Sequence, residues 1–536
     1  MTSKTSCFDS AVFRRDVRRG APLWSLFLLI LLVALPLPLS NFADHLRRQQ
    51  EFSIDVQYQI LSVGHMLASV GSSLYGLAAA WLAFYYLFTG KSANFYAALP
   101  VRREAMFATH YLAGLTIHIV PMLLISAVTF AASAMVGAPQ LGACAQVFSE
   151  NVLSFLFFYN FAVLCCMIVG NAIMMPIVYF ILNFAIPVVE LMIRTVLQAF
   201  VYGMPNVSGV HLAPFAPAWF LLSNGMVVPQ FDAWYDLTGY CLEGWAYLLI
   251  LAAVGVLFGA LALVLYKKRE MERSGDVIAV RWLRPVFLYA FTFGCALVIG
   301  VVIVSLITDG QLETNFLPTL LSMLTGTLIG YLTAQMLLQK SARVLKKSWK
   351  GLVICCALVT LALGAVRLDL TGYASRVPEA SEVASVEVGR YQGDSSPITD
   401  EDAIAQTIAL HQYFVDTRGA REDLTPADTD NAWWNNDICI RYTLKDGSTF
   451  ARTYTFLCSA STAADPDSAY NRANALMHTQ SVRLAMYAPG FAVTEQSVLD
   501  CTLDGPIVYD EQLGDWRYSS LTLSSREAAA LYNDCI

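Results

Sequence analysis

Charged side chains are scarce in this chain of 536 residues. Only 14% of the residues are Asp, Glu, Lys or Arg, while 56% are hydrophobic and the mean hydropathy is +0.53. This balance excludes an ordinary water-soluble protein and indicates a chain embedded in lipid. The charges are also divided unevenly, since residues 1–377 carry 24 basic and 17 acidic residues and residues 378–536 carry 10 basic and 24 acidic residues. The sequence therefore predicts a basic membrane part joined to an acidic domain.

The motifs of common catalytic sites are missing. Residues 90–92 read Gly-Lys-Ser, but Tyr85 stands where a phosphate-binding loop needs its first glycine. The seven histidines are isolated, so the paired-histidine motif of zinc proteases is absent, and the sequence around Ser73 lacks the second glycine of a nucleophile elbow. We therefore expect no catalytic residue, metal site or bound cofactor in this chain, and no enzyme activity of its own.

Cysteines occur in both parts without metal-ligand spacing. Eight of the twelve lie in or near the membrane part, where a thiol acts as a small apolar side chain. An exported acidic domain would permit disulfides, whose pairing the spacing leaves open. The cysteines concerned are Cys439, Cys458, Cys501 and Cys535.

Nine apolar runs are long enough to cross a bilayer. The first is too long for a cleavable signal core and is interpreted as a span. The runs lie near residues 22–39, 66–89, 112–136, 152–169, 172–197, 245–266, 285–307, 316–338 and 351–366.

Basic residues predict the orientation. If the N-terminus is cytoplasmic, the inside segments hold 19 Lys and Arg residues, and the outside loops between spans hold only Arg47 and Arg48. The positive-inside rule favours this topology, and nine spans place the C-terminal domain outside the cell.

Ionisable residues inside the predicted spans are few. They are His118, and Glu190 with Arg194, whose i, i+4 spacing favours a structural ion pair. Pairs of small residues at Gly255 and Gly259, and at residues 326 and 330, are typical of close helix packing.

Residues 198–244 contain no Lys or Arg but are rich in proline and aromatic residues. This composition predicts short helices at or dipping into the outer interface of the membrane, with an ordered loop as the alternative.

The residues after Asp369 have the pattern of a soluble α+β domain. Acidic residues open a predicted helix at 400–415, and Asp446-Gly447 lies between the alternating segments 437–444 and 449–457, which predicts a β-hairpin. Asp465-Pro466 is expected to begin another helix. Ser524 and Glu527 predict a capping box for a last helix that ends near Asn533.

Two predicted cytoplasmic elements carry patterned residues. Residues 8–19 predict an amphipathic helix along the inner membrane interface. Its apolar and basic residues are Phe8, Val12, Phe13, Arg14, Arg15, Arg18 and Arg19. The second element is the loop 90–111, which reads Asn-Phe-Tyr-Ala-Ala-Leu-Pro-Val-Arg-Arg-Glu-Ala-Met-Phe over residues 94–107.

The Leu-Pro, basic and apolar pattern of this loop resembles the loop between the second and third spans of type 2 ABC permeases. The basic segment 267–284 is also similar to a Gram-positive bacterial subgroup in which three more spans and an exported domain of unknown function follow a six-span core. The resemblance implies that the loop docks onto a separate ATPase. The docking residues it implies are Leu99, Pro100, Arg102, Arg103, Glu104 and Phe107.

The resemblance divides the chain into functional parts. It implies an interfacial helix at 1–21, a permease core at 22–266, the linker 267–284, three further helices at 285–367 and an α+β domain at 368–536. It also implies a transport subunit in a bacterial plasma membrane, driven by ATP in a partner ATPase and paired with a second permease subunit. The expected substrate is amphiphilic or related to the cell envelope, and no nucleic acid is involved. A membrane-anchored sensor and a secondary transporter are the alternatives.

Overall fold

The architecture is that of a computed structural model. The residues it describes are 8–39, 52–205, 210–232, 236–269, 275–307, 316–341, 343–391, 393–417, 432–487, 502–510 and 515–527.

Nine helices within these residues are long and apolar enough to cross a membrane, so the nine apolar runs are confirmed as helical and indicate a multi-pass membrane protein. The second, third and fourth begin well before their apolar runs, at Ser53, Arg103 and Leu141. The elements concerned are α2 (Ala21–Ala34), α4 (Phe52–Met66) with η1 (Leu67–Gly71), α5 (Ser72–Phe84) and η2 (Tyr85–Phe88), α7 (Arg103–Met135), α8 (Leu141–Ile168), α9 (Met174–Phe200), α11 (Trp245–Lys268), α12 (Leu283–Ile307), α13 (Phe316–Gln339) and α14 (Leu345–Arg367).

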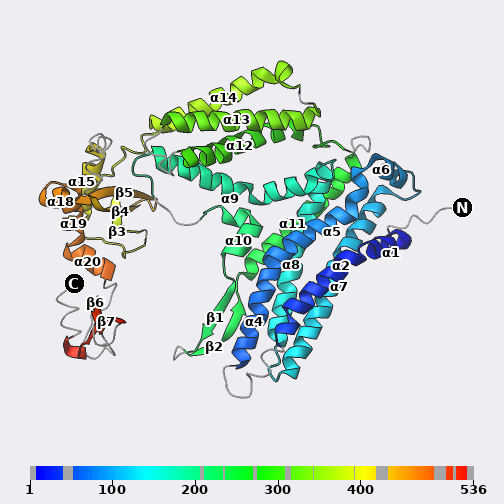
Figure 1. The fold of residues 1–536 in the computed structure, drawn as a ribbon, viewed down its shortest axis with the longest axis horizontal. Helices are drawn as coiled ribbons and strands as arrows, with labels where there is room; N and C mark the ends of the chain where they lie inside the picture. The colour runs from blue at the N-terminus through cyan, green and yellow to red at the C-terminus, as the bar shows by residue number, and fades with distance from the viewer. Residues whose placement is uncertain are drawn as a thin grey trace. The chain divides into compact units, whose positions relative to one another are not determined.

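Helix α8 is the centre of the first compact unit, and α4, α5, α7 and α11 pack against it (Figure 1). Its side chains Phe155, Phe158 and Tyr159 are fully buried. Gly255 of α11 lies so close to the backbone of α8 that a side chain there would collide with Phe157. The predicted close packing at this glycine is confirmed, because only a small residue lets two helices approach this far.

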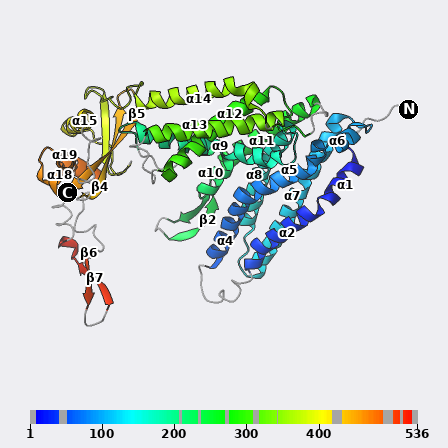
Figure 2. The same ribbon diagram turned by 45° about the horizontal axis from the view of Figure 1, so that its top comes forward.

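Helices α12, α13 and α14 lie side by side in both ribbon views (Figures 1 and 2). Gly326 and Gly330 of α13 face the backbone or side chain of Cys295 on α12, where a larger residue would collide. Tyr331 and Cys355 are buried in the small core between these helices. The second pair of small residues therefore also marks a helix contact.

The segment between α9 and α11 contains η3 (Ala213–Phe215) and α10 (Pro217–Ser223), as the proline and aromatic composition predicts. It also contains an unpredicted antiparallel hairpin of β1 (Val227–Phe231) and β2 (Leu237–Leu242). These strands were missed because their register has a bulge and their side chains do not alternate cleanly between buried and exposed.

The second compact unit comprises Arg194–Gly209, Gln311–Phe316 and Leu361–Ile536. Its main sheet is antiparallel, in the order β3-β4-β5. The elements are β3 (Val383–Gly389), α15 (Glu401–Asp416), β4 (Ala432–Leu444), β5 (Thr449–Ser459), α18 (Ala460–Ala464), α19 (Ala469–Met477), α20 (Gln480–Tyr487), and a separate hairpin of β6 (Thr502–Asp510) and β7 (Asp515–Thr522).

Most local signals in this unit are confirmed. Asp400 caps α15, and the hairpin turns at Gly447, whose φ of 82° favours glycine. Ser524 and Glu527 form the predicted capping box, although the end of that helix lies outside the described residues. The helix start at residues 465–466 is wrong, because the Ser468 side chain caps α19, which begins at Ala469.

Candidate functional site

The predicted amphipathic helix is confirmed as α1 (Ser10–Arg19), which begins after its cap Asp9 and packs against α7. The Asp9 amide donates to Thr109 Oγ1 at 3.1 Å, and the Asp16 carboxylate is hydrogen-bonded to His110 Nδ1. These contacts fix α1 against the start of α7.

The side chains of α1 divide as its pattern predicts. Val12 and Val17 pack against the helical core, while the guanidinium of Arg15 lies 5.8 Å from the ring centre of Tyr96. The other predicted residues are placed as follows: Phe8 contacts Phe13, Arg19 lies 5.6 Å from the ring centre of Tyr85, and Arg14 and Arg18 are exposed.

The predicted docking loop folds as α6 (Gly90–Ala97), a short turn and the first residues of α7. Pro100 and Arg102 are exposed in the turn, whereas Leu99 is half-buried against the helical core. Phe107 is only 5% exposed and packs between Phe84 and Tyr266. Its predicted role in filling a groove on a partner is wrong, because the residue lies one turn inside α7 and faces the bundle.

The exposed aromatic ring of this region belongs to Phe95 on α6, which is 57% exposed. Lys91, one turn before Phe95, and Asn94, next to it in the chain, are also exposed. We call these three residues of α6, with the exposed Arg102 in the turn that follows it, the α6 surface.

Arg103 and Glu104 bind the end of α11. The Arg103 guanidinium donates to the carbonyl oxygen of Lys267 at 3.0 Å, and Glu104 forms an ion pair with the Lys267 ammonium. Both residues therefore join α7 to α11, in addition to any role at the rim of a docking surface.

Arg269, immediately after α11, is 7% exposed and holds several chain ends together. Its guanidinium donates to the carbonyl oxygens of Cys166, Met167 and Val169 at the end of α8, and of Leu87 in η2. These carbonyls have no partner within their own helices, so one side chain satisfies the ends of two elements. Burial lowers the pKa of Arg269, but an arginine stays charged.

The linker that follows is folded against the turn between α8 and α9. The Gly170 amide donates to the carbonyl oxygen of Asp276 at 2.9 Å, and the Ala279 amide donates to that of Ile168 at 2.8 Å. The Asp276 carboxylate pairs with Arg284 at 2.7 Å and with Lys340 at 2.6 Å. Partial burial alone would raise the pKa of Asp276, but these two cations outweigh it and lower the pKa.

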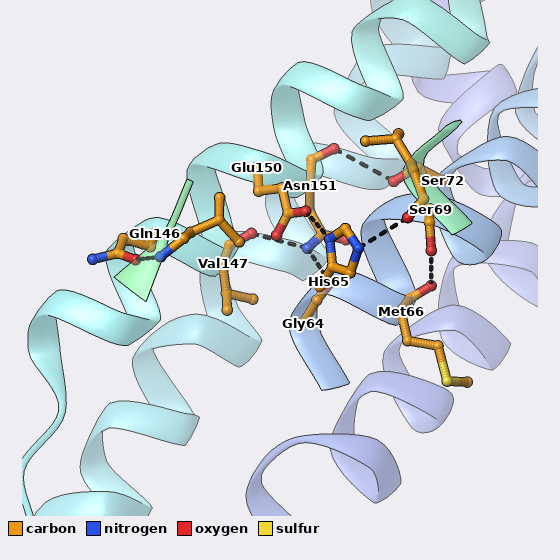
Figure 3. Close-up of polar contacts among 11 residues, drawn as sticks. Gly64, His65, Met66, Ser69, Ser72, Gln146, Val147, Glu150 and Asn151 are labelled. Atoms are coloured by element: carbon orange, nitrogen blue, oxygen red, sulfur yellow. Dashed lines mark hydrogen bonds and ion pairs between the residues drawn. The ribbon is translucent and has the colours of Figure 1, made fainter. Parts of the chain in front are cut away.

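A second polar site lies between α4 and α8 (Figure 3). His65 Nδ1 lies 2.6 Å from Glu150 Oε1, and His65 Nε2 lies 2.9 Å from the carbonyl oxygen of Leu221 in α10. The Glu150 side chain is 0% exposed, and its second oxygen has no partner among the described residues. One histidine thus connects two membrane helices to the short helix α10.

These contacts require a proton between His65 and Glu150. The Leu221 carbonyl only accepts, so His65 Nε2 must carry a hydrogen. A neutral His65 then presents a lone pair at Nδ1, and two acceptors 2.6 Å apart would repel each other. The bridge therefore holds either an imidazolium and a carboxylate or a neutral imidazole and a carboxylic acid. Both forms leave this buried site without net charge, which is the cheapest state in an apolar environment.

The backbone beside His65 is irregular. Residues 67–71 form one π-helical turn, a distortion that occurs frequently at functional sites. Asn151 donates to the carbonyl oxygen of Gly64 at 3.0 Å and so satisfies a group of this region from the neighbouring helix (Figure 3). Gln57 of α4 and Gln146 of α8 bind the β2 backbone at Tyr240 and Leu242. Polar residues on two helices therefore hold both α10 and the hairpin.

Sequence reasoning missed His65 and Glu150 because both fall just before predicted apolar runs. The polar residues next to Glu150 could have indicated a polar site. Gln146 lies four residues before Glu150 and Asn151 one residue after it, all near the start of α8. His65 and Glu150 lie within the bundle because the helices that carry them begin well before the apolar runs by which hydropathy defines the spans.

The other ionisable residues predicted inside spans have separate environments. His118 is fully buried, with its ring 3.7 Å from that of Phe155, and neither nitrogen has a partner among the described residues. Glu190 accepts the backbone amides of His211 and Leu212 at 2.9 and 2.7 Å. Its pairing with Arg194 stays a prediction.

No group of three or more His, Cys, Asp or Glu side chains in the described ranges could hold a metal ion. Cys439 is a free, buried thiol. No protein-family profile, curated protein or solved structure matches this chain.

Proposed function

We propose that this protein is the transmembrane permease subunit of an ATP-binding-cassette transporter that exports or extracts an amphiphilic or envelope-related substrate. Its partners are a separate ATPase, which binds the α6 surface from the cytoplasm, and a second permease subunit. In the proposed topology the N-terminus is cytoplasmic and the C-terminal domain (residues 368–536) lies outside a bacterial plasma membrane.

The connection between the α6 surface and the helix ends behind it supports this proposal most directly. Arg103 and Glu104 join the start of α7 to the end of α11, and the adjacent Arg269 binds the ends of α8 and η2. These charged hydrogen bonds join four membrane elements, α7, α11, α8 and η2, beside the turn that connects α6 to α7, so a displacement of that turn would act on all four. A permease driven by a separate ATPase needs such a connection, because differential contacts with the ATPase must change its helix arrangement.

The test replaces two exposed residues of the α6 surface, as Phe95→Ala with Arg102→Glu. Both side chains are exposed, and the described packing contact that Phe95→Ala removes is the edge-to-face contact of its ring with the neighbouring Tyr96, so the protein should insert and fold normally. An ATP-binding-cassette ATPase should copurify with the wild type and be reduced at least tenfold with the variant, because aromatic and arginine residues dominate binding energy at interfaces.

The matched control is Trp282→Ala with Arg281→Glu, which removes an exposed aromatic ring and reverses an exposed arginine on the linker. The control should retain the ATPase. Equal loss in both variants would indicate a general effect of basic charge, and full retention by the α6 variant would reject the proposed docking surface.

A further inference from the structure

A groove of about 920 Å³ lies in the C-terminal domain. It is bounded by the sheet β3-β4-β5 and by α19 and α20, and its floor contains the buried side chains Ile438, Phe456 and Ala473. This volume is within the range of specific small-ligand sites, and an apolar floor is typical of them.

One edge of the groove is formed by the first part of β4, which is paired with another strand on one side only. β3 pairs with β4 only as far as Gly389 opposite Cys439, and the chain then leaves the sheet at Arg390. β4 extends further, to Ala432, and pairs with β5 over this part. Among the described strands, none continues β3 beside residues 432–438. The backbone edge at Asn436 to Ile438, which lines the groove, can therefore accept an added strand.

The rim carries charges of both signs. Arg390 and Arg483 provide guanidinium groups, and Asp394 and Asp437 provide carboxylates. Within the described parts of the chain, no ion pair joins any two of these four residues. Arginine recognises a carboxylate through paired charged hydrogen bonds, and a carboxylate recognises an ammonium group. Unneutralised charges of both signs around an apolar floor complement a ligand that is itself zwitterionic and partly apolar.

From the strand edge, the floor and the rim charges together, we infer that this groove binds a short extended peptide with a free C-terminal carboxylate, which adds as a strand to the edge of β4. Backbone hydrogen bonds supply affinity for any extended peptide, and the apolar floor selects side chains at alternate positions. The arginines select the free carboxylate. This inference goes beyond the proposed transport function and does not depend on the ATPase.

The test uses the full-length protein in lipid nanodiscs and a pool of hexapeptides with alternating apolar and polar positions. The pool is prepared with free carboxylates, with C-terminal amides, and with N-methylated backbone amides. Equilibrium dialysis followed by mass spectrometry measures retention. We expect the free-carboxylate pool to be retained at least tenfold more than either modified pool, and to slow amide exchange in residues 432–438.

The variant Arg390→Gln with Arg483→Gln should reduce retention of the free-carboxylate pool about tenfold or more, while Lys445→Gln, an exposed change at the hairpin turn, should leave it unchanged. The thermal unfolding of all variants is compared with that of the wild type to verify folding. Equal retention of acid and amide pools, or of the acid pool by wild type and arginine variant, overturns the inference. Absence of retention of every pool, as expected if a segment of this chain or a second copy occupies the groove, overturns it as well.

Discussion

Tyr202, which follows α9, lies against Tyr454 of β5 with ring centroids 5.2 Å apart. The next residue, Gly203, accepts the Thr453 amide at 3.3 Å and has a φ of 73°, and a side chain there would collide with the Tyr454 ring. A segment directly connected to a membrane helix therefore completes the core of the C-terminal domain. An isolated fragment of residues 379–536 would have to fold without this ring.

Removal of the Tyr202 ring should destabilise the C-terminal domain. Tyr202→Ala loses an aromatic contact and part of a buried surface, at a cost of about 1–2 kcal/mol. We expect faster proteolysis of the domain in the full-length protein. Tyr391→Ala, at a side chain that is 74% exposed, should leave the rate unchanged. Equal rates for Tyr202→Ala and wild type would show that the contact adds nothing to stability.

The proton between His65 and Glu150 should control α10. Loss of that proton as pH rises leaves two facing acceptors, so the bridge must open and release either Leu221 or Glu150. Backbone amide exchange over residues 213–224, corrected for the intrinsic effect of pH, should therefore accelerate at alkaline pH. The elements η1 and α10, which pack around the pair, contain no ionisable side chain. On α4 itself, Asp55 lies nearer the start of the helix.

Glu150→Gln is the matched variant for this bridge. Its amide can donate to His65 Nδ1 while Nε2 still donates to Leu221, so the contacts persist without a titratable proton. We expect protection of α10 that no longer depends on pH. His65→Ala should lose protection at every pH, because it removes the donor to the Leu221 carbonyl oxygen and with it the connection to α10. Protection in the wild type that is independent of pH would contradict the proposed control.

Arg269→Lys should loosen the ends of α8 and η2. A lysine ammonium is one point charge with three donors, and it cannot reproduce the planar fork that reaches four carbonyl oxygens. The loss of charged hydrogen bonds should cost about 2–3 kcal/mol. Thermal unfolding in nanodiscs measures the change. Lys268→Arg, at the neighbouring exposed residue, is the control, and a Tm like that of the wild type for Arg269→Lys would refute the clamp.

His411 should make the C-terminal domain sensitive to acid. Burial, and secondarily the nearby Arg452, lower the pKa of His411 to about 3. Its folded pKa is below the unfolded value of roughly 6.5, so the associated stability is present above that value and decreases as pH falls towards 3. The slope should be about 1.4 kcal/mol per pH unit in this window. His411→Gln should flatten the decrease measured by tryptophan fluorescence, and an unchanged slope would show that another group is responsible.

The residues of the predicted docking loop illustrate how far sequence pattern can place a site. Its position between two membrane helices followed from hydropathy. The burial of Phe107 could not be predicted, because it depends on which face of α7 meets Phe84 and Tyr266. The exposure of Phe95 likewise depends on where α6 ends and how the turn at residues 98–102 directs α7.

Local physical chemistry that can be read from the sequence determined the nine long apolar helices within the described residues, the hairpin at Gly447 and the caps at Asp400 and Ser524. Lipid requires long apolar runs, and turns and caps require particular residues at adjacent positions. The bridge from His65 to Glu150 and Leu221 was decided only by the tertiary structure. Its members are far apart in the chain, and the π-helical turn that accompanies the bridge depends on how α4 packs against α8, which no local pattern encodes.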